Sequence, residues 1–160
     1  MKQKICQKTN KRGFTLIELL VVIGILALLL AITLIAINPA KQFAQANDTK
    51  RSSDVNAILN ALNQYAADNR GQLPAGIGAS AVSIGSSGVN LCADLVTEYL
   101  AALPTDPTSG NTAGEVGAPV TVCTAAYDTG YVVSRSADNN RLTVTATSEV
   151  NPTIPISVTR

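Results

Sequence analysis

One carboxylate, Glu18, stands in an apolar stretch over residues 14–37 that holds no other charged side chain. Inserting a carboxylate at the middle of a bilayer costs roughly 2.5–3.5 kcal/mol. The dipole of a helix N-terminus offsets only some tenths of a kcal/mol of that cost. Glu18 lies near one end of the stretch, where it can reach the membrane interface. A carboxylate at this position therefore either balances the dipole of the helix N-terminus or pairs with a cation.

Other reactive side chains are few. The sequence has no histidine, which excludes Ser-His-Asp and Cys-His arrangements. It also lacks a phosphate-binding glycine loop and a dinucleotide fingerprint. We therefore expect no enzyme and no cofactor.

Three cysteines are present, and two of them, Cys92 and Cys123, lie 31 positions apart. Without a CxxC pair or a histidine, a zinc site is not expected. A disulfide between Cys92 and Cys123 fits an oxidising compartment, and two buried free thiols are the alternative. Cys6 belongs to the basic N-terminal segment.

Basic residues gather ahead of the apolar stretch. Five lysines and arginines precede Gly13, whereas residues 14–160 hold seven basic and eleven acidic side chains. Because Lys and Arg remain on the cytoplasmic side of a membrane, we expect the remainder of the chain outside. As a helix the stretch is about 36 Å long, which is enough for a hydrocarbon core of about 30 Å. It is longer than the apolar core of a secretory signal, so we predict a retained membrane helix.

A polar, helix-compatible segment follows Pro39. Its apolar residues recur at spacings of three and four and form one stripe: Val55, Ile58, Leu59, Leu62, Tyr65 and Ala66. Gly71 is suited to end the helix. We predict one long helix from about Phe14 to Arg70, apolar all round in its first half and amphipathic in its second half.

The remaining residues predict a small antiparallel sheet that covers this stripe. The expected elements are a loop over 75–90, a helix over 91–103, a loop over 104–119, and strands over 120–123, 130–136 and 141–148. In the last strand, apolar residues alternate with threonine, which predicts one buried face. The fold class is therefore α+β. Residues 71–160 hold three basic and seven acidic side chains, which argues against nucleic-acid binding.

The segment RGFTLIELLVVIGIL resembles the cleavage and methylation segment of the type IV pilins and of the pseudopilins of type II secretion. The matching positions are Gly13, Phe14, Thr15, Leu16, Ile17, Glu18 and Leu19, after a short basic leader. YLAALPTDP at 99–107 is similar to a turn that follows the second helix in major pseudopilins and many pilins. Asp138, Asn139 and Asn140 faintly resemble the calcium-binding loop of major pseudopilins, although a hairpin turn explains the same residues.

This resemblance implies that a membrane-embedded prepilin peptidase cuts between Gly13 and Phe14, and that the new amino group of Phe14 is N-methylated. Glu18 then has three possible roles. It balances the helix dipole, pairs with the amino group of its own Phe14 one turn away, or pairs with the Phe14 amino group of a neighbouring subunit. The resemblance further implies that Gly24 and Pro39 bracket a part of the helix that loses regular structure on assembly.

Four parts are expected: a removed basic leader over 1–13, a membrane and filament-core helix over 14–38, its amphipathic continuation over 39–70, and a type IV pilin-like head over 71–160. The expected function is that of a structural subunit of a type IV pilus-like filament that serves adhesion or motility. The resemblance implies copies of the chain, a prepilin peptidase and methylase, and an inner-membrane platform with a cytoplasmic ATPase as partners. It places the chain in the inner membrane before assembly and in an extracellular or periplasmic filament afterwards.

Two alternatives to this function stay open at this point. One is a major pseudopilin of a type II secretion system, which the turn at 99–107 favours, whereas the cysteine pair favours the pilin. The other is a single-span, membrane-anchored binding protein that never polymerises.

Overall fold

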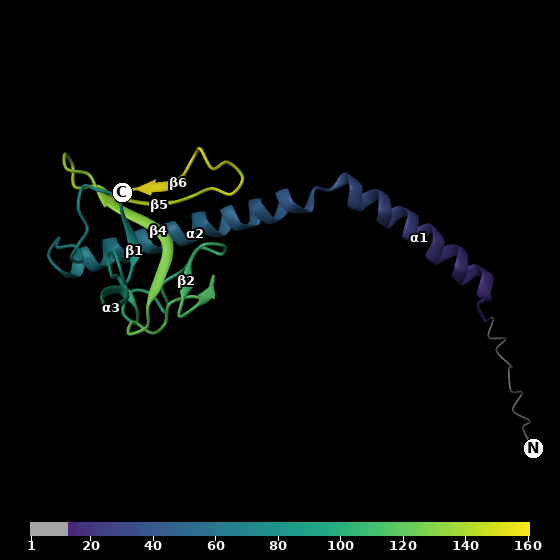
Figure 1. The fold of residues 1–160 in the computed structure, drawn as a ribbon, viewed down its shortest axis with the longest axis horizontal. Coiled ribbons are helices and arrows are strands. Elements are labelled where there is room, and N and C mark those ends of the chain that lie inside the picture. The colour runs from purple at the N-terminus through teal and green to yellow at the C-terminus, as the bar shows by residue number, and fades with distance from the viewer. Residues whose placement is uncertain (1–12) are drawn as a thin grey trace, which may run out of the picture. The chain divides into compact units, whose positions relative to one another are not determined.

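The computed structural model describes residues 13–160, so the expected leader lies, apart from Gly13, outside the described residues. The chain forms two compact units, one up to Pro39 and one from Ala40 to Arg160 (Figure 1). The predicted α+β class is confirmed, because a long N-terminal helix, present as two segments, precedes a small antiparallel sheet of six strands.

The two helical segments are α1 (Leu16–Ala36) and α2 (Pro39–Asp68). Between them Ile37 takes an extended conformation (φ −99°, ψ 121°). Pro39 explains this interruption, because proline lacks an N–H donor and disfavours helical geometry in the preceding residue. The same ring is well suited to the first position of a new helix. The helix expected to be continuous from Phe14 to Arg70 is therefore interrupted at Ile37 and Asn38.

The predicted stripe of α2 packs on the head. Its buried residues are Arg51, Val55, Ile58, Leu59, Ala61 and Leu62, and Tyr65 packs against the same core while half-buried. The helix ends where expected, since Arg70 and Gly71 have positive φ and the Gly71 N–H donates to the Ala66 carbonyl at 2.7 Å. Burial of this stripe supplies the hydrophobic stabilisation that joins α2 to the sheet.

The sheet is antiparallel throughout, in the order β3-β2-β4-β5-β6 with β1 also paired to β4. The strands are β1 (Val82–Gly85), β2 (Asn111–Thr112), β3 (Glu115–Val116), β4 (Tyr127–Arg135), β5 (Leu142–Ala146) and β6 (Ile156–Thr159). In β5 the predicted alternation holds, because Leu142, Val144 and Ala146 are buried and the two threonines between them are half-buried. The long strand β4 contacts β1, β2 and β5 and is the centre of the head.

Several expected boundaries were wrong. The strand expected over 120–123 is reduced to a single bridge between Val120 and Leu103. The helix expected over 91–103 is only α3 (Cys92–Leu95), because Val96 is extended and Thr97 has a φ of 81°. Strand β1 lies in the expected loop over 75–90, and the β2–β3 hairpin lies in the expected loop over 104–119.

Candidate functional site

The segment that resembles the pilin processing site lies at the start of α1. Thr15 is the N-cap of this helix, with extended backbone geometry, and Phe14 is 87% exposed. The Thr15 hydroxyl accepts from the Glu18 backbone N–H at 3.3 Å, while Glu18 Oε2 accepts from the Thr15 N–H and hydroxyl, both at 2.8 Å. This reciprocal arrangement is a capping box, which satisfies two donors that a helix N-terminus leaves unpaired.

The capping box gives Glu18 a partner inside its own chain. Both Thr15 bonds reach Oε2, and within the described residues Oε1 accepts no hydrogen bond. Oε1 is thus open to a donor from outside the chain. Phe14 has a free amino group only after cleavage between Gly13 and Phe14. Pairing of Glu18 with that group, in its own chain or in a neighbour, therefore remains a prediction. The sequence indicates this capping box, because Glu18 follows Thr15 by three positions.

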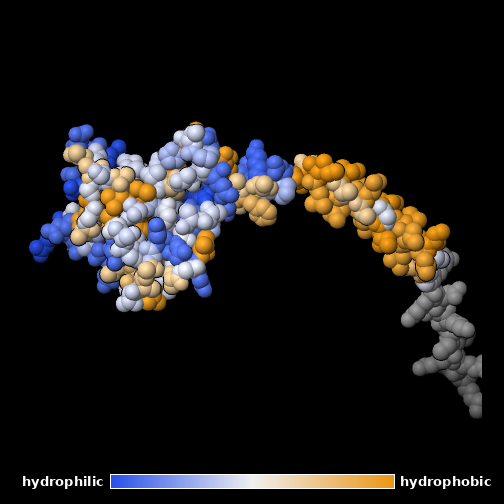
Figure 2. Space-filling view, viewed as in Figure 1, coloured by the Kyte–Doolittle hydropathy of each residue, from blue (hydrophilic) through white to orange (hydrophobic). Residues whose placement is uncertain are grey.

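The surface of α1 is apolar on every side. None of its residues is buried in the structure, its large hydrophobic side chains are exposed, and the face drawn in Figure 2 is mostly hydrophobic. Its 21 residues span about 32 Å at 1.5 Å per residue, which matches a hydrocarbon core of about 30 Å. By length and composition α1 is able to cross a membrane.

The two expected weak points of the helix behave differently in the single chain. Gly24 lies inside regular helix, and a Cβ added there would meet no atom within 4 Å. Pro39 begins α2 directly after the interruption at Ile37 and Asn38. Loss of helix on assembly in the part that Gly24 and Pro39 bracket remains a prediction.

In the head, Arg51 joins α2 to two loops. Its side chain is 3% exposed and forms a bidentate pair with Asp106, with Nε 2.6 Å from Oδ2 and Nη2 3.1 Å from Oδ1. Nη2 also donates to Thr108 Oγ1 at 2.7 Å, and Nη1 donates to Asp48 at 2.8 Å and to Glu149 at 3.2 Å. Bidentate charge-assisted bonds of this kind are strong and directional. We call Arg51, Asp106, Asp48 and Glu149 the Arg51 clasp.

The electrostatics of the clasp favour its ionised state. Burial alone would raise the pKa of Asp106, but bonds from Arg51, the Thr108 N–H and hydroxyl and the Ser109 N–H hold that pKa well below its usual range. The same pair with Asp106 raises the pKa of Arg51. Asp106 belongs to the turn at 99–107 that resembled a pseudopilin turn, and its observed contacts give it a structural role.

Asp48 holds the loop between β5 and β6 against α2. Burial opposes its ionisation, but it accepts bonds from the Glu149 N–H at 2.8 Å, the Ser148 hydroxyl at 2.6 Å and the Val150 N–H at 3.1 Å. Together with Arg51 these donors lower the pKa of Asp48 to about 2. The loop is therefore fixed to the helix by a carboxylate that stays charged at neutral pH.

The structure joins Cys92 and Cys123 in a disulfide with a Cα–Cα distance of 5.4 Å. Cys92 begins α3 and is fully buried, whereas Cys123 is half-buried in the segment before β4. The disulfide joins residues 31 positions apart. By restricting the unfolded chain, it contributes about 3–4 kcal/mol to the free energy of unfolding.

The weak calcium candidates form the turn between β4 and β5. Asn139 Oδ1 accepts from the Arg141 N–H at 3.2 Å, and Asn140 has a φ of 56°. Of the three, Asp138 alone carries a carboxylate, and within residues 13–160 no group of three His, Cys, Asp or Glu side chains is placed to hold a metal. The turn geometry accounts for these residues.

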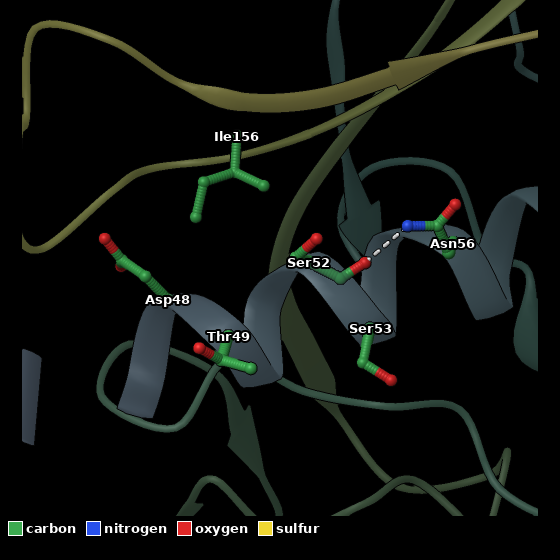
Figure 3. A pocket seen from close by; sticks show the side chains of 6 residues that line it. All are labelled: Asp48, Thr49, Ser52, Ser53, Asn56 and Ile156. Atoms are coloured by element: carbon green, nitrogen blue, oxygen red, sulfur yellow. Dashed lines mark hydrogen bonds between the residues drawn. The ribbon is translucent and has the colours of Figure 1, made fainter. Parts of the chain in front are cut away.

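A groove of about 600 Å³ separates α2 from β6 (Figure 3). It is lined by Asp48, Thr49, Ser52, Ser53, Asn56 and Ile156. Asn56 donates to the Ser52 carbonyl at 2.8 Å, and the Asp48 carboxylate is occupied by the loop between β5 and β6. These contacts are structural, and the groove brings together no pair of groups suited to acid–base or nucleophilic catalysis.

Comparison with known proteins agrees with the N-terminal geometry. Residues 8–34 match the family model described as the prokaryotic N-terminal methylation motif. No curated protein and no solved structure matches the chain. The chain thus carries this motif on an apolar N-terminal helix, which is consistent with a type IV pilin-like prepilin. The motif implies processing by a prepilin peptidase, and the apolar helix indicates single-pass anchoring of the prepilin.

Proposed function

We propose that this chain is the structural subunit of a type IV pilus-like extracellular filament that assembles through its N-terminal helix. The observation that carries the proposal is the methylation motif, with Glu18 in the first turn of an apolar helix. Such a helix is stored in a membrane and is later buried among the helices of a filament core. Apolar surface is removed from water in both environments, so transfer between them need not be prohibitive.

Processing is proposed to occur between Gly13 and Phe14, followed by N-methylation of Phe14. Cleavage creates an ammonium group at Phe14 and removes the five basic residues that precede Gly13. The Glu18 carboxylate keeps Oε1 available for that ammonium while Oε2 caps the helix through Thr15. Because an ammonium from a neighbouring subunit would satisfy Oε1 in a low-dielectric environment, the pairing favours docking of a new subunit.

The partners of this function are proposed from the same motif. They are copies of the chain, a prepilin peptidase that also methylates, and an inner-membrane platform with a cytoplasmic ATPase. The chain would lie in the inner membrane before assembly, with the head from residue 71 onward outside the cytoplasm and on the filament surface afterwards. Adhesion or motility would then be a property of the filament.

A major pseudopilin of a type II secretion system is the second candidate, and the turn at 99–107 favours it. Asp106 of that turn is bound by Arg51, a role that fits either type of filament. Electron microscopy of the producing cells separates the two, since a pilus is long and extracellular and a pseudopilus is short and periplasmic. A chain found as an unassembled membrane protein would instead be the anchored binding protein.

Substitutions at Glu18 test the assembly mechanism. Glu18→Gln keeps a side chain that can complete the capping box but removes the charge, whereas Glu18→Ala removes both. We expect both variants to be cleaved at Gly13 and to lower the filament yield by at least about tenfold, the effect of losing roughly 1.4 kcal/mol. Full assembly of cleaved Glu18→Gln would show that capping suffices, and full assembly of cleaved Glu18→Ala would refute the mechanism.

A further inference from the structure

Basic residues gather at one end of the sheet, although the head is acidic on average. Residues 71–160 hold three basic side chains, Arg135, Arg141 and Arg160, and all three are exposed. Arg135 ends β4, and its partner in β5 is Leu142. Arg141 directly precedes Leu142, and Arg160 exchanges backbone hydrogen bonds with it. We call these three arginines the basic end.

The charges of the basic end are not neutralised by the described part of the chain. Within residues 13–160, none of the three arginines lies within ion-pair distance of a carboxylate. Arg160 donates to the uncharged amide oxygen of Asn60. Asp138 occupies the turn of the same hairpin, so the side chains of this region carry an excess of two positive charges. This excess is available to an acidic partner.

Two acidic side chains lie at the opposite end of β4. Asp128 is the second residue of β4 and pairs with Asn111 of β2, and β2 in turn pairs with β3, which contains Glu115. Both carboxylates are exposed. Seven positions separate Asp128 from Arg135, which is about 23 Å along a strand, and Figure 1 shows β4 running between the two regions. We call Asp128 and Glu115 the acidic end.

A hollow lies beside the acidic end. It has a volume of about 250 Å³ and is lined by Ser86, Ser87, Asn111, Ala126, Tyr127 and Asp128. The hydroxyl and amide groups around a carboxylate offer hydrogen-bond acceptors for a guanidinium. The acidic end therefore combines charge with a concave, polar surface.

We propose that the basic end of one copy of the chain docks on the acidic end of the next copy. This inference rests on the proposed function and names a contact between heads that adds to the assembly of the N-terminal helices. The contact joins two different surfaces of one chain, so it is heterologous and leaves a free end at each terminus of the assembly. Contacts of this type produce open filaments when the rotation between copies does not close a ring.

The charge of α2 and the head together favours a second copy over a polyanion as the partner. From Ala40 onward the chain holds seven basic and ten acidic side chains, a net charge of −3. A polyanion approaching the basic end would be repelled by this excess. A second copy carries the same net charge, but it presents the local carboxylates of its acidic end to the basic end. Complementary charges of this kind orient the approach of two proteins and suppress wrong pairings.

Crosslinking in intact filaments tests the contact directly. The full chain would carry Ala137→Cys in the β4–β5 turn together with Ser87→Cys in the hollow, and sheared filaments would be treated with a bifunctional maleimide. We expect a ladder of dimers, trimers and higher species from the double variant and monomers from each single variant. A matched control, Ala137→Cys with Gln64→Cys on the exposed face of α2, should give no ladder.

Charge-reversal variants provide a second test of the contact between heads. Arg135→Glu with Arg141→Glu should lower the filament yield by about tenfold, and adding Glu115→Arg should restore part of it. Arg70 is another exposed arginine without a carboxylate partner in the described part of the chain. The control variant Arg70→Glu should therefore leave the filament yield unchanged. Normal filaments without a ladder, or charge-reversed variants that lose only retention on heparin, would overturn this inference and leave the proposed function standing. An unmodified chain that forms no filament would overturn both.

Discussion

Replacing Arg51 by methionine should destabilise the head strongly. The guanidinium is 3% exposed and carries five hydrogen bonds to four side chains of the head and α2. Methionine keeps most of the apolar stem but leaves the buried Asp106 carboxylate without its cation. Removing one partner of a buried pair costs about 3–5 kcal/mol. Because three donors from Thr108 and Ser109 still reach Asp106, we expect a loss of about 3 kcal/mol, near the lower limit.

The assay is urea unfolding of the full chain in detergent micelles, followed by tyrosine fluorescence. All four tyrosines lie between residues 65 and 131 and the chain has no tryptophan, so the signal reports the head and not α1. Arg135→Met is the matched control, because Arg135 is exposed and has no carboxylate partner in the described residues. The control should change stability by less than about 0.5 kcal/mol.

A double variant separates the pair from its surroundings. Arg51→Met combined with Asp106→Leu removes both charges, so it should cost less than the sum of the two single variants. A loss below about 1 kcal/mol for Arg51→Met alone, the size expected of an exposed pair, would refute the view that the Arg51 clasp is a buried structural element.

Three further predictions concern the head. Cys92→Ser with Cys123→Ser should lower the free energy of unfolding by about 3 kcal/mol, measured by the same urea titration. Folding lowers the pKa of Asp48 to about 2, whereas its unfolded pKa is about 4. The stability that Asp48 contributes is therefore fully present above pH 4 and is lost as the pH falls from 4 towards 2. Asp48→Asn should flatten this part of the plot of unfolding free energy against pH. Gly110→Ala should cost about 1–3 kcal/mol in a thermal melt, because the added Cβ would lie 2.7 Å from the Asp106 backbone nitrogen and 2.8 Å from the Thr129 carbonyl.

The sequence predicted the parts of the fold that local patterns determine. The length of one apolar stretch predicts α1. The period of a single element predicts the other two features, which are the three-and-four spacing from Val55 to Leu62 and the alternation in β5. The interruption at Ile37 was less evident, although Pro39 was recognised as a weak point. A proline at the start of a second helix and a proline that kinks one helix give the same local pattern.

The short strands could not be predicted in this way. Strands β2 and β3 have two residues each, too few to show a period, and β1 lies in a Gly/Ser-rich stretch that resembles a loop. These segments become strands because their backbone groups pair with one another or with β4. Pairing with a distant strand is a tertiary effect, and strand propensity depends strongly on such context.

The Arg51 clasp was missed for a similar reason. Arg51 and Asp106 lie 55 positions apart in the chain. The local sequence around either residue does not indicate that the two form a pair. A clue was present, since Arg51 precedes Val55 by four positions and so extends the buried stripe of α2. A charged residue on a buried face needs a partner, and the turn at 99–107 contained the carboxylate that supplies it.

The central claim is best tested by mass spectrometry of the chain recovered from filaments sheared off the cells that produce it. The claim predicts an N-terminal peptide that begins with N-methylated Phe14, followed by Thr15 and the apolar helix, and no peptide from residues 1–13. A chain that retains Met1 at its N-terminus, or that is found only in the membrane fraction with no filament, would contradict it.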